Sequence, residues 1–278
     1  MQIINTYESI KKAFPDHTFV MDSWVKYASA ISPELMEKCI NDAEKYDFDG
    51  QVLPILNDAL SHPAEMELLS NHFQTVINLL KLNYSKLFDR DIPLDIILYL
   101  GLCNGAGQAT TLGGRDVILL GMEKIIELQW YDEDGLLALI FHELGHVWHR
   151  IYGVISFPTE NQTEWSLLQL YQEGIAMVCE HILCGDDNFY HQDKNGWLSW
   201  CRQNETVIKE EYLRRLEAAE STQDFFGDWC SYEGHSDVGY FLGCRFVEHL
   251  QKKYTLVEIS SLSYPIFRDE FTRFAAES

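Results

Sequence analysis

The fold of this chain is decided by residues 135–149, which read GLLALIFHELGHVWH. The first part of this stretch is apolar and consists mostly of good helix formers. Asp132 or Asp134 can cap the start of a helix here, and we predict that the helix runs to about Arg150. His142 and His146 are four residues apart, so they share one helical face about one turn from each other.

This face has the residue types of a metal site. Two imidazoles at this spacing can reach one tetrahedral ion. Glu143 lies beside the first histidine and can accept a proton from a water molecule at the open side of the ion. A buried helix with two satisfied histidines is the alternative, but burying two imidazoles and a carboxylate without a function is costly. The pattern predicts one zinc ion per chain, bound by His142 and His146, with Glu143 as general base.

A catalytic zinc needs a third protein ligand and an open fourth position. The sites that place a histidine six residues after the second one are excluded, because that position is Tyr152. The better candidate is Glu173, in the sequence YQEGIA on the next predicted helix. Two antiparallel helices would bring it against the histidine face, and Glu164 or Glu180 would be the next candidates.

HELGH followed by QEGIA resembles the gluzincin superfamily of zinc metallopeptidases. In that superfamily HExxH supplies two ligands and a glutamate on a following helix supplies the third. QEGIA is similar to the asparagine-glutamate-glycine-aromatic-alanine stretch of gluzincin aminopeptidases, although Gln172 and Ile175 depart from it. The sequence YFLG from Tyr240 resembles their tyrosine-x-lysine-glycine motif without its lysine. The resemblance implies that Tyr240 stabilises the oxyanion, with His235 as the main rival for that role.

The chain is also similar to a group of bacterial predicted zinc-dependent proteases with HExxH, EGxA and GYxxG in the same order. The resemblance covers roughly residues 95–255. It implies a peptidase that acts on a peptide or protein, with a thermolysin-like catalytic core. The aminopeptidase motif that binds a free amino terminus is not evident, and GMEK at 121–124 is only a partial echo of it.

The remaining pattern predicts an α+β fold, mainly helical, with a small sheet beside the active-site helix. Residues 1–90 read as a helical N-terminal region, with one helix starting at Ser32-Pro33 and another pattern over 63–88. Residues 91–278 read as a gluzincin-like zinc hydrolase domain. Its predicted strands are 95–102 and 116–121, joined by a loop over 103–114, and its later helices cover about 164–183, 197–219 and 238–254. Strand 116–121 is the expected edge of the cleft, where an extended peptide would pair.

The net charge, the N-terminal sequence and the cysteines limit which partners and which cell compartment are expected. A net charge of −22 repels phosphate backbones, so nucleic acid is not an expected partner. The acidity serves solubility or attracts basic peptides. The N-terminus shows no secretory signal, no apolar run spans a membrane, and seven irregularly spaced cysteines are typical of reduced thiols. These features favour a cytoplasmic protein, and they leave its oligomeric state open.

Several other residues have open roles. His149 is either a neighbour of the metal ligands or a plain surface or core histidine, and Glu180 could orient a ligand histidine. Cys179, His181 and Cys184 lie on one predicted helix, where their spacing does not converge on one point.

A zinc-dependent peptidase is the expected function. The alternatives are a zinc-binding regulatory or binding module with little turnover, and a hydrolase of non-peptide amides.

Overall fold

The computed structural model describes residues 2–154, 160–227 and 229–276. The chain forms two compact units, Met1–Glu143 and Leu144–Ser278, and their boundary falls within the continuous helix α7 (Glu133–Tyr152). The sequence pattern had placed the division near residue 90. Strand β1 (Gln2–Asn5), which precedes residue 90, is hydrogen-bonded to β2 (Leu94–Tyr99), which follows it.

The first unit contains a four-stranded mixed sheet in the order β1-β2-β4-β3. Strands β1, β2 and β4 (Arg115–Gly121) are parallel, and β3 (Gly107–Leu112) is antiparallel to β4. The two predicted strands are therefore neighbours, as expected. Every residue of β2 is buried, which fits a central strand with both faces covered.

Two strand predictions were wrong. The segment predicted as a loop contains β3, whose sequence GQATTL has the polar and small residues of a half-exposed edge strand. Strand β4 was expected to form the edge of the cleft and to pair with an extended peptide, but it is already paired with β2 on one side and with β3 on the other. Both sides of β4 are therefore occupied, and a further strand could pair only with β3, the outermost strand on that side of the sheet.

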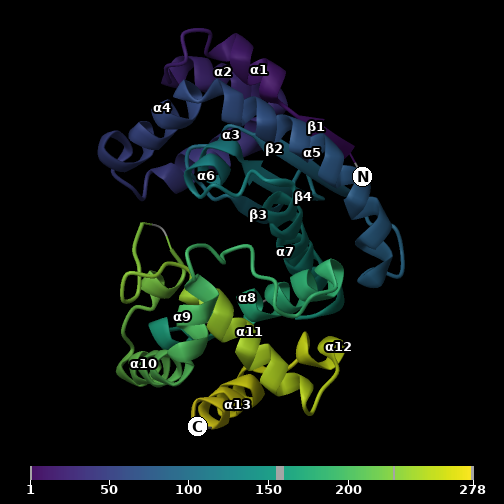
Figure 1. Ribbon diagram of the computed structural model, residues 1–278, viewed down its shortest axis with the longest axis vertical. Coiled ribbons are helices and arrows are strands. Elements are labelled where there is room, and N and C mark those ends of the chain that lie inside the picture. Colours follow the sequence, from purple (N-terminus) through teal and green to yellow (C-terminus); the bar gives the residue numbers. More distant parts are fainter. Residues whose placement is uncertain (1, 155–159, 228, 277–278) are drawn as a thin grey trace. The chain divides into compact units, whose positions relative to one another are not determined.

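Helices cover the sheet of the first unit (Figure 1). They are α1 (Tyr7–Ala13), α2 (Met21–Ile31), α3 (Pro33–Ala43), the π-helical turn η1 (Phe48–Val52), α4 (Leu53–Ser61), α5 (Pro63–Asn83), the 3-10 turn η2 (Tyr84–Lys86) and α6 (Met122–Glu127). The predicted start at Ser32 is confirmed, because its hydroxyl accepts a hydrogen bond from the Leu35 N–H at 3.4 Å.

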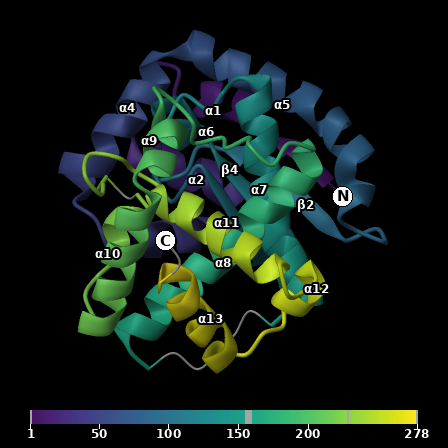
Figure 2. The same ribbon diagram turned by 60° about the horizontal axis from the view of Figure 1, so that its bottom comes forward.

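The second unit is helical. Besides the end of α7, it contains α8 (Gln162–Cys184), α9 (Trp197–Gln203), α10 (Glu205–Ala218), the 3-10 turn η3 (Gln223–Phe225), α11 (Val238–Gln251), α12 (Leu256–Ile259) and α13 (Tyr264–Ala276). The helix predicted over 197–219 is two helices, because Asn204 leaves the helical conformation at φ −109° and ψ 11°. Figure 2 shows α11 lying against α8, with α10 and α13 beside them.

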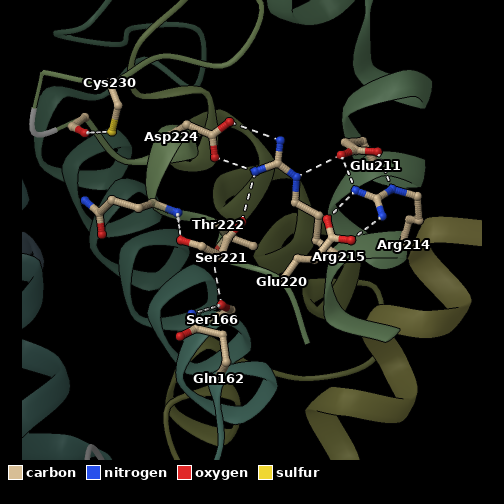
Figure 3. A network of polar contacts seen from close by, with 12 residues as sticks. Gln162, Ser166, Glu211, Arg214, Arg215, Glu220, Ser221, Thr222, Asp224 and Cys230 are labelled. Atoms are coloured by element: carbon tan, nitrogen blue, oxygen red, sulfur yellow. Dashed lines mark hydrogen bonds and ion pairs between the residues drawn. The ribbon is translucent and has the colours of Figure 1, made fainter. Parts of the chain in front are cut away.

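A polar network fixes the segment that follows α10 (Figure 3). Arg215 donates to the carboxylates of Glu211 and Asp224 and to the Ser221 carbonyl. The Thr222 hydroxyl donates to Ser166 on α8 at 2.8 Å. These contacts tie the turn η3 to two helices of its own unit.

The fold class is thus α+β, mainly helical with one small mixed sheet, as predicted. Across the described parts of the chain, no helix has both the length and the apolar character needed to cross a bilayer.

Candidate metal centre

Helix α7 begins where the sequence predicted. The Asp132 carboxylate accepts a hydrogen bond from the Gly135 N–H at 2.8 Å, so it satisfies one donor of the first turn. The apolar residues that follow are buried. They carry His142 and Glu143, which are only 3% and 5% exposed, into the interior, while the His146 side chain keeps 24% of its surface exposed.

Small residues let α8 approach the end of α7 closely. A Cβ atom added at Gly145 would lie only 2.7 Å from the Ala176 Cα atom, so the two backbones are in direct contact. Glu173 lies one helical turn before Ala176 on α8. As a result, one Glu173 carboxylate oxygen lies 3.1 Å from His146 Nε2.

The three residues predicted as ligands each offer a donor atom, and these atoms lie within 4.8 Å of one another. Two imidazoles and one carboxylate are a donor set of catalytic zinc sites. Ligand bonds of about 2.0–2.1 Å in a tetrahedron would place neighbouring donor atoms about 3.4 Å apart. The separation of 3.1 Å between His146 and Glu173 is close to that value, and the three donor types are those of a zinc site.

The predicted general base lies against the edge strand. A Cβ atom added at Gly107, the first residue of β3, would be 2.5 Å from Glu143 Oε1 and 2.9 Å from its Cγ. The carboxylate therefore occupies the space that a side chain at position 107 would fill. Gly107 lies in the segment predicted as a loop, so this contact could not be predicted from the sequence.

The other acidic candidates on α8 have different partners. A Glu164 carboxylate oxygen accepts a hydrogen bond from the Glu160 N–H at 2.7 Å. The Glu180 carboxylate is fully buried and lies 3.0 Å from His191 Nδ1. It can therefore orient His191, a residue that no sequence motif pointed to.

His149 is a core histidine, one of the two roles left open for it. It is 1% exposed, and its Nε2 lies 3.2 Å from the Ser260 carbonyl oxygen. Burial, with a smaller contribution from His146, lowers the pKa of His149 to about 4. The ring is therefore neutral at physiological pH.

The two candidate oxyanion donors have different surroundings. Tyr240 lies on the first turn of α11, half-buried, with its ring 5.9 Å from that of Phe226. One turn later, Gly243 is in backbone contact with Gly174, the residue after Glu173. His235 precedes α11 and stacks on Trp200, with the ring centroids 3.8 Å apart and the planes 8° from parallel. The helix contact links Tyr240 to the neighbourhood of Glu173, whereas the described contacts of His235 are with Trp200 and the Glu233 carbonyl.

Glu123 lies in the segment that partly matches the motif for binding an amino terminus, and it has a structural role here. It is fully buried and accepts hydrogen bonds from the Gly101 N–H at 2.9 Å and the Cys103 N–H at 3.0 Å. Burial raises the pKa of this carboxyl group. The side chain holds the loop after β2, so it is not aimed at a substrate.

Comparisons of the chain with protein-family models, with curated proteins and with solved structures give no match.

Proposed function

We propose that this protein is a zinc-dependent peptidase whose catalytic ion is held by His142, His146 and Glu173. The observation that carries the proposal is the convergence of these three donors from α7 and α8, with the Glu143 carboxylate on the same helix. A helix–helix pair with these ligands is what a thermolysin-like core would contain. That finer description of the fold belongs to the proposal.

The roles of the side chains follow from their positions. An ion bound there would polarise a substrate carbonyl and lower the pKa of a water molecule. Glu143 accepts the proton of the attacking water and passes it to the leaving amine. Tyr240 donates a hydrogen bond to the oxygen on which negative charge develops, with His235 as the alternative donor.

The edge strand β3 gives the substrate an orientation. An extended peptide hydrogen-bonded to β3 near Gly107 would lie beside the Glu143 carboxylate. The other end of the strand is covered by α3. Lys38 donates to the Thr111 carbonyl at 2.7 Å, and Glu34 accepts from the Gly113 N–H at 2.8 Å. Pairing would therefore be confined to the end of β3 that is next to the general base.

The test combines metal analysis with substrate profiling on the full chain. Zinc content is measured in the parent and in the variant His142→Ala/His146→Ala, and both are incubated with a peptide library. We expect the variant to bind one zinc fewer per chain and to cleave nothing. Equal zinc content in the two proteins would refute the ligand assignment. A zinc-loaded parent that cleaves no peptide would refute the peptidase and favour a binding module or a hydrolase of other amides.

A further inference from the structure

A second group of metal-binding side chains lies within residues 144–278. His181, Cys244 and Glu248 each offer a donor atom, and these atoms lie within 4.8 Å of one another. His181 is eight residues beyond Glu173 on α8, which is about 12 Å along the helix axis. This group is therefore separate from the ligands of the proposed catalytic ion.

The packing of α8 against α11 produces the convergence. Gly174 and Gly243 meet backbone to backbone, because a Cβ atom at either position would overlap the other helix. Cys244 and Glu248 are four residues apart on α11, so they share one face of it. His181 on α8 lies next to Cys244 and Glu248. The spacing of Cys179, His181 and Cys184 along one helix could not reveal this group, because two of its members lie on another helix.

The distances fit a transition-metal site. Cys244 Sγ is 3.8 Å from His181 Nδ1 and 3.9 Å from Glu248 Oε1. A tetrahedral ion with a sulfur bond of about 2.3 Å and nitrogen or oxygen bonds of about 2.0–2.1 Å would place these atoms about 3.6 Å apart. Little movement of the side chains would be needed to bind such an ion.

The surroundings also favour a bound ion. His181 is only 3% exposed, and its Nδ1 faces the Cys244 sulfur inside the unit. Cys244 is fully buried, forms no disulfide and is hydrogen-bonded by the Tyr190 hydroxyl. Arg245 pairs with the second oxygen of Glu248, which leaves Oε1 facing the sulfur.

A cavity reaches one of the three donors, Glu248, while His181 and Cys244 do not line it. Glu248 and Tyr190 both line this cavity, whose volume is about 420 Å³. Such a cavity can supply a water molecule as a fourth ligand.

We propose that His181, Cys244 and Glu248 bind a second divalent ion of the zinc type, through one nitrogen, one sulfur and one oxygen. The ion joins the end of α8 to the middle of α11, the helix that carries Tyr240. The chain would then hold two zinc ions, in place of the one that the sequence predicted.

Cobalt is the probe for this site, because a thiolate bound to Co²⁺ gives a near-ultraviolet charge-transfer band that the His142, His146 and Glu173 ligands cannot give. The metal-free variant His142→Ala/His146→Ala is titrated with Co²⁺, so that only the second site remains intact. We expect one equivalent to bind per chain with the thiolate band. Adding Cys244→Ala should abolish both the band and that equivalent. Adding Cys201→Ala, which alters another buried cysteine of the same unit, should leave both unchanged.

The absence of the band in the starting variant would overturn the proposal, as would a band that survives Cys244→Ala. If Cys244→Ala does not fold, as judged by circular dichroism, Glu248→Gln decides, because unchanged Co²⁺ affinity in that variant would also overturn the proposal. A failure of the proposed catalytic site gives a different result. The parent and the double-histidine variant would then bind the same number of ions, and the thiolate band would still appear.

Discussion

Glu143 and Glu173 should respond differently to substitution, because they have different positions relative to the two histidines. Glu143→Gln removes the general base but no ligand, so zinc should stay bound while kcat falls by roughly 10²–10⁴-fold. Glu173→Ala removes the oxygen that lies 3.1 Å from His146 Nε2, so zinc affinity should fall. Zinc titration and peptide cleavage on both variants separate the two effects. Equal zinc affinity in Glu173→Ala and the parent would exclude this glutamate as a ligand.

Tyr240 is the expected oxyanion donor, because its helix contacts α8 beside Glu173. Tyr240→Phe keeps the ring and removes only the hydroxyl, so fold and zinc content should be unchanged. We expect kcat to fall by roughly 10²–10³-fold, the usual effect of losing one such donor. His235→Ala serves as the comparison and should have a much smaller effect. The reverse ranking of the two variants would assign the role to His235.

Gly107 provides a test of the position of Glu143. In Gly107→Ala the new methyl group would lie 2.5 Å from Glu143 Oε1, and the flexible end of the glutamate would have to move. We expect the fold and the zinc to be retained and kcat to fall at least tenfold, since a displaced base loses its alignment. Thr111→Ala is the matched control, because it alters an exposed residue on the same strand. If both variants had parental kcat, Glu143 would not act from this position.

At the scale of elements, the contact between α8 and α11 depends on the absence of side chains. In Gly174→Ala the methyl group would overlap the Gly243 carbonyl oxygen, so the helices would have to separate. We expect a loss of roughly 1–3 kcal/mol in the free energy of unfolding, the range of overpacking, with weaker zinc binding because Glu173 moves. The control is Gly135→Ala, where the nearest atom would be 3.3 Å away, on the Asp132 side chain. Urea unfolding of both variants should show a large effect only for the first, and equal losses would contradict the packing argument.

The elements that the sequence predicted are those with strong local signals. Ser32 and Asp132 are capping residues whose effect depends only on the next turn, so the starts of α3 and α7 could be predicted. Strand β3 could not, because only one of its six residues is buried and its sequence lacks the apolar pattern of a buried strand. Strand β1 has only four residues, and its pairing with β2 spans more than ninety positions of the chain.

The candidate site residues also divide into those that local spacing predicts and those that depend on the packing of distant segments. The spacing of His142 and His146 is local to one helix, so the pair was visible in the sequence. The choice of Glu173 depended on the assumption that two antiparallel helices pack against each other, and the resemblance agreed with it. The group of His181, Cys244 and Glu248 joins residues more than sixty positions apart. It exists only because two glycines bring α8 and α11 together, and no spacing rule contains that information.

At the scale of the whole molecule, the acidic composition makes stability depend on pH. Hydrogen bonds from Arg214 and Arg215 lower the pKa of Glu211 from 4.5 to about 2. Because the folded pKa is the lower one, the ionised carboxylate stabilises the fold above about pH 4.5, and this contribution is lost as the pH falls towards about 2. We expect Glu211→Gln to be less stable than the parent near neutral pH (Figure 3).

The measurement is the free energy of unfolding of both proteins as the pH is lowered. The difference between them should shrink steadily below about pH 4.5. Lowering the pH protonates many other carboxylates in both proteins alike, so only the difference reports on Glu211. A difference that stays constant down to about pH 2 would show that this group does not titrate as described.

Helix α3 also has a consequence for self-association. A strand at the edge of a sheet can pair with the same strand of another copy, which is how sheets extend into aggregates. At the far end of β3, the Lys38 amine and the Glu34 carboxylate already occupy the backbone groups of Thr111 and Gly113. An incoming chain would have to displace these bonds and bury both charges, which is costly. The two charged residues therefore protect this end of the strand against edge-to-edge aggregation, while the Gly107 end is the one at which we propose that a peptide pairs.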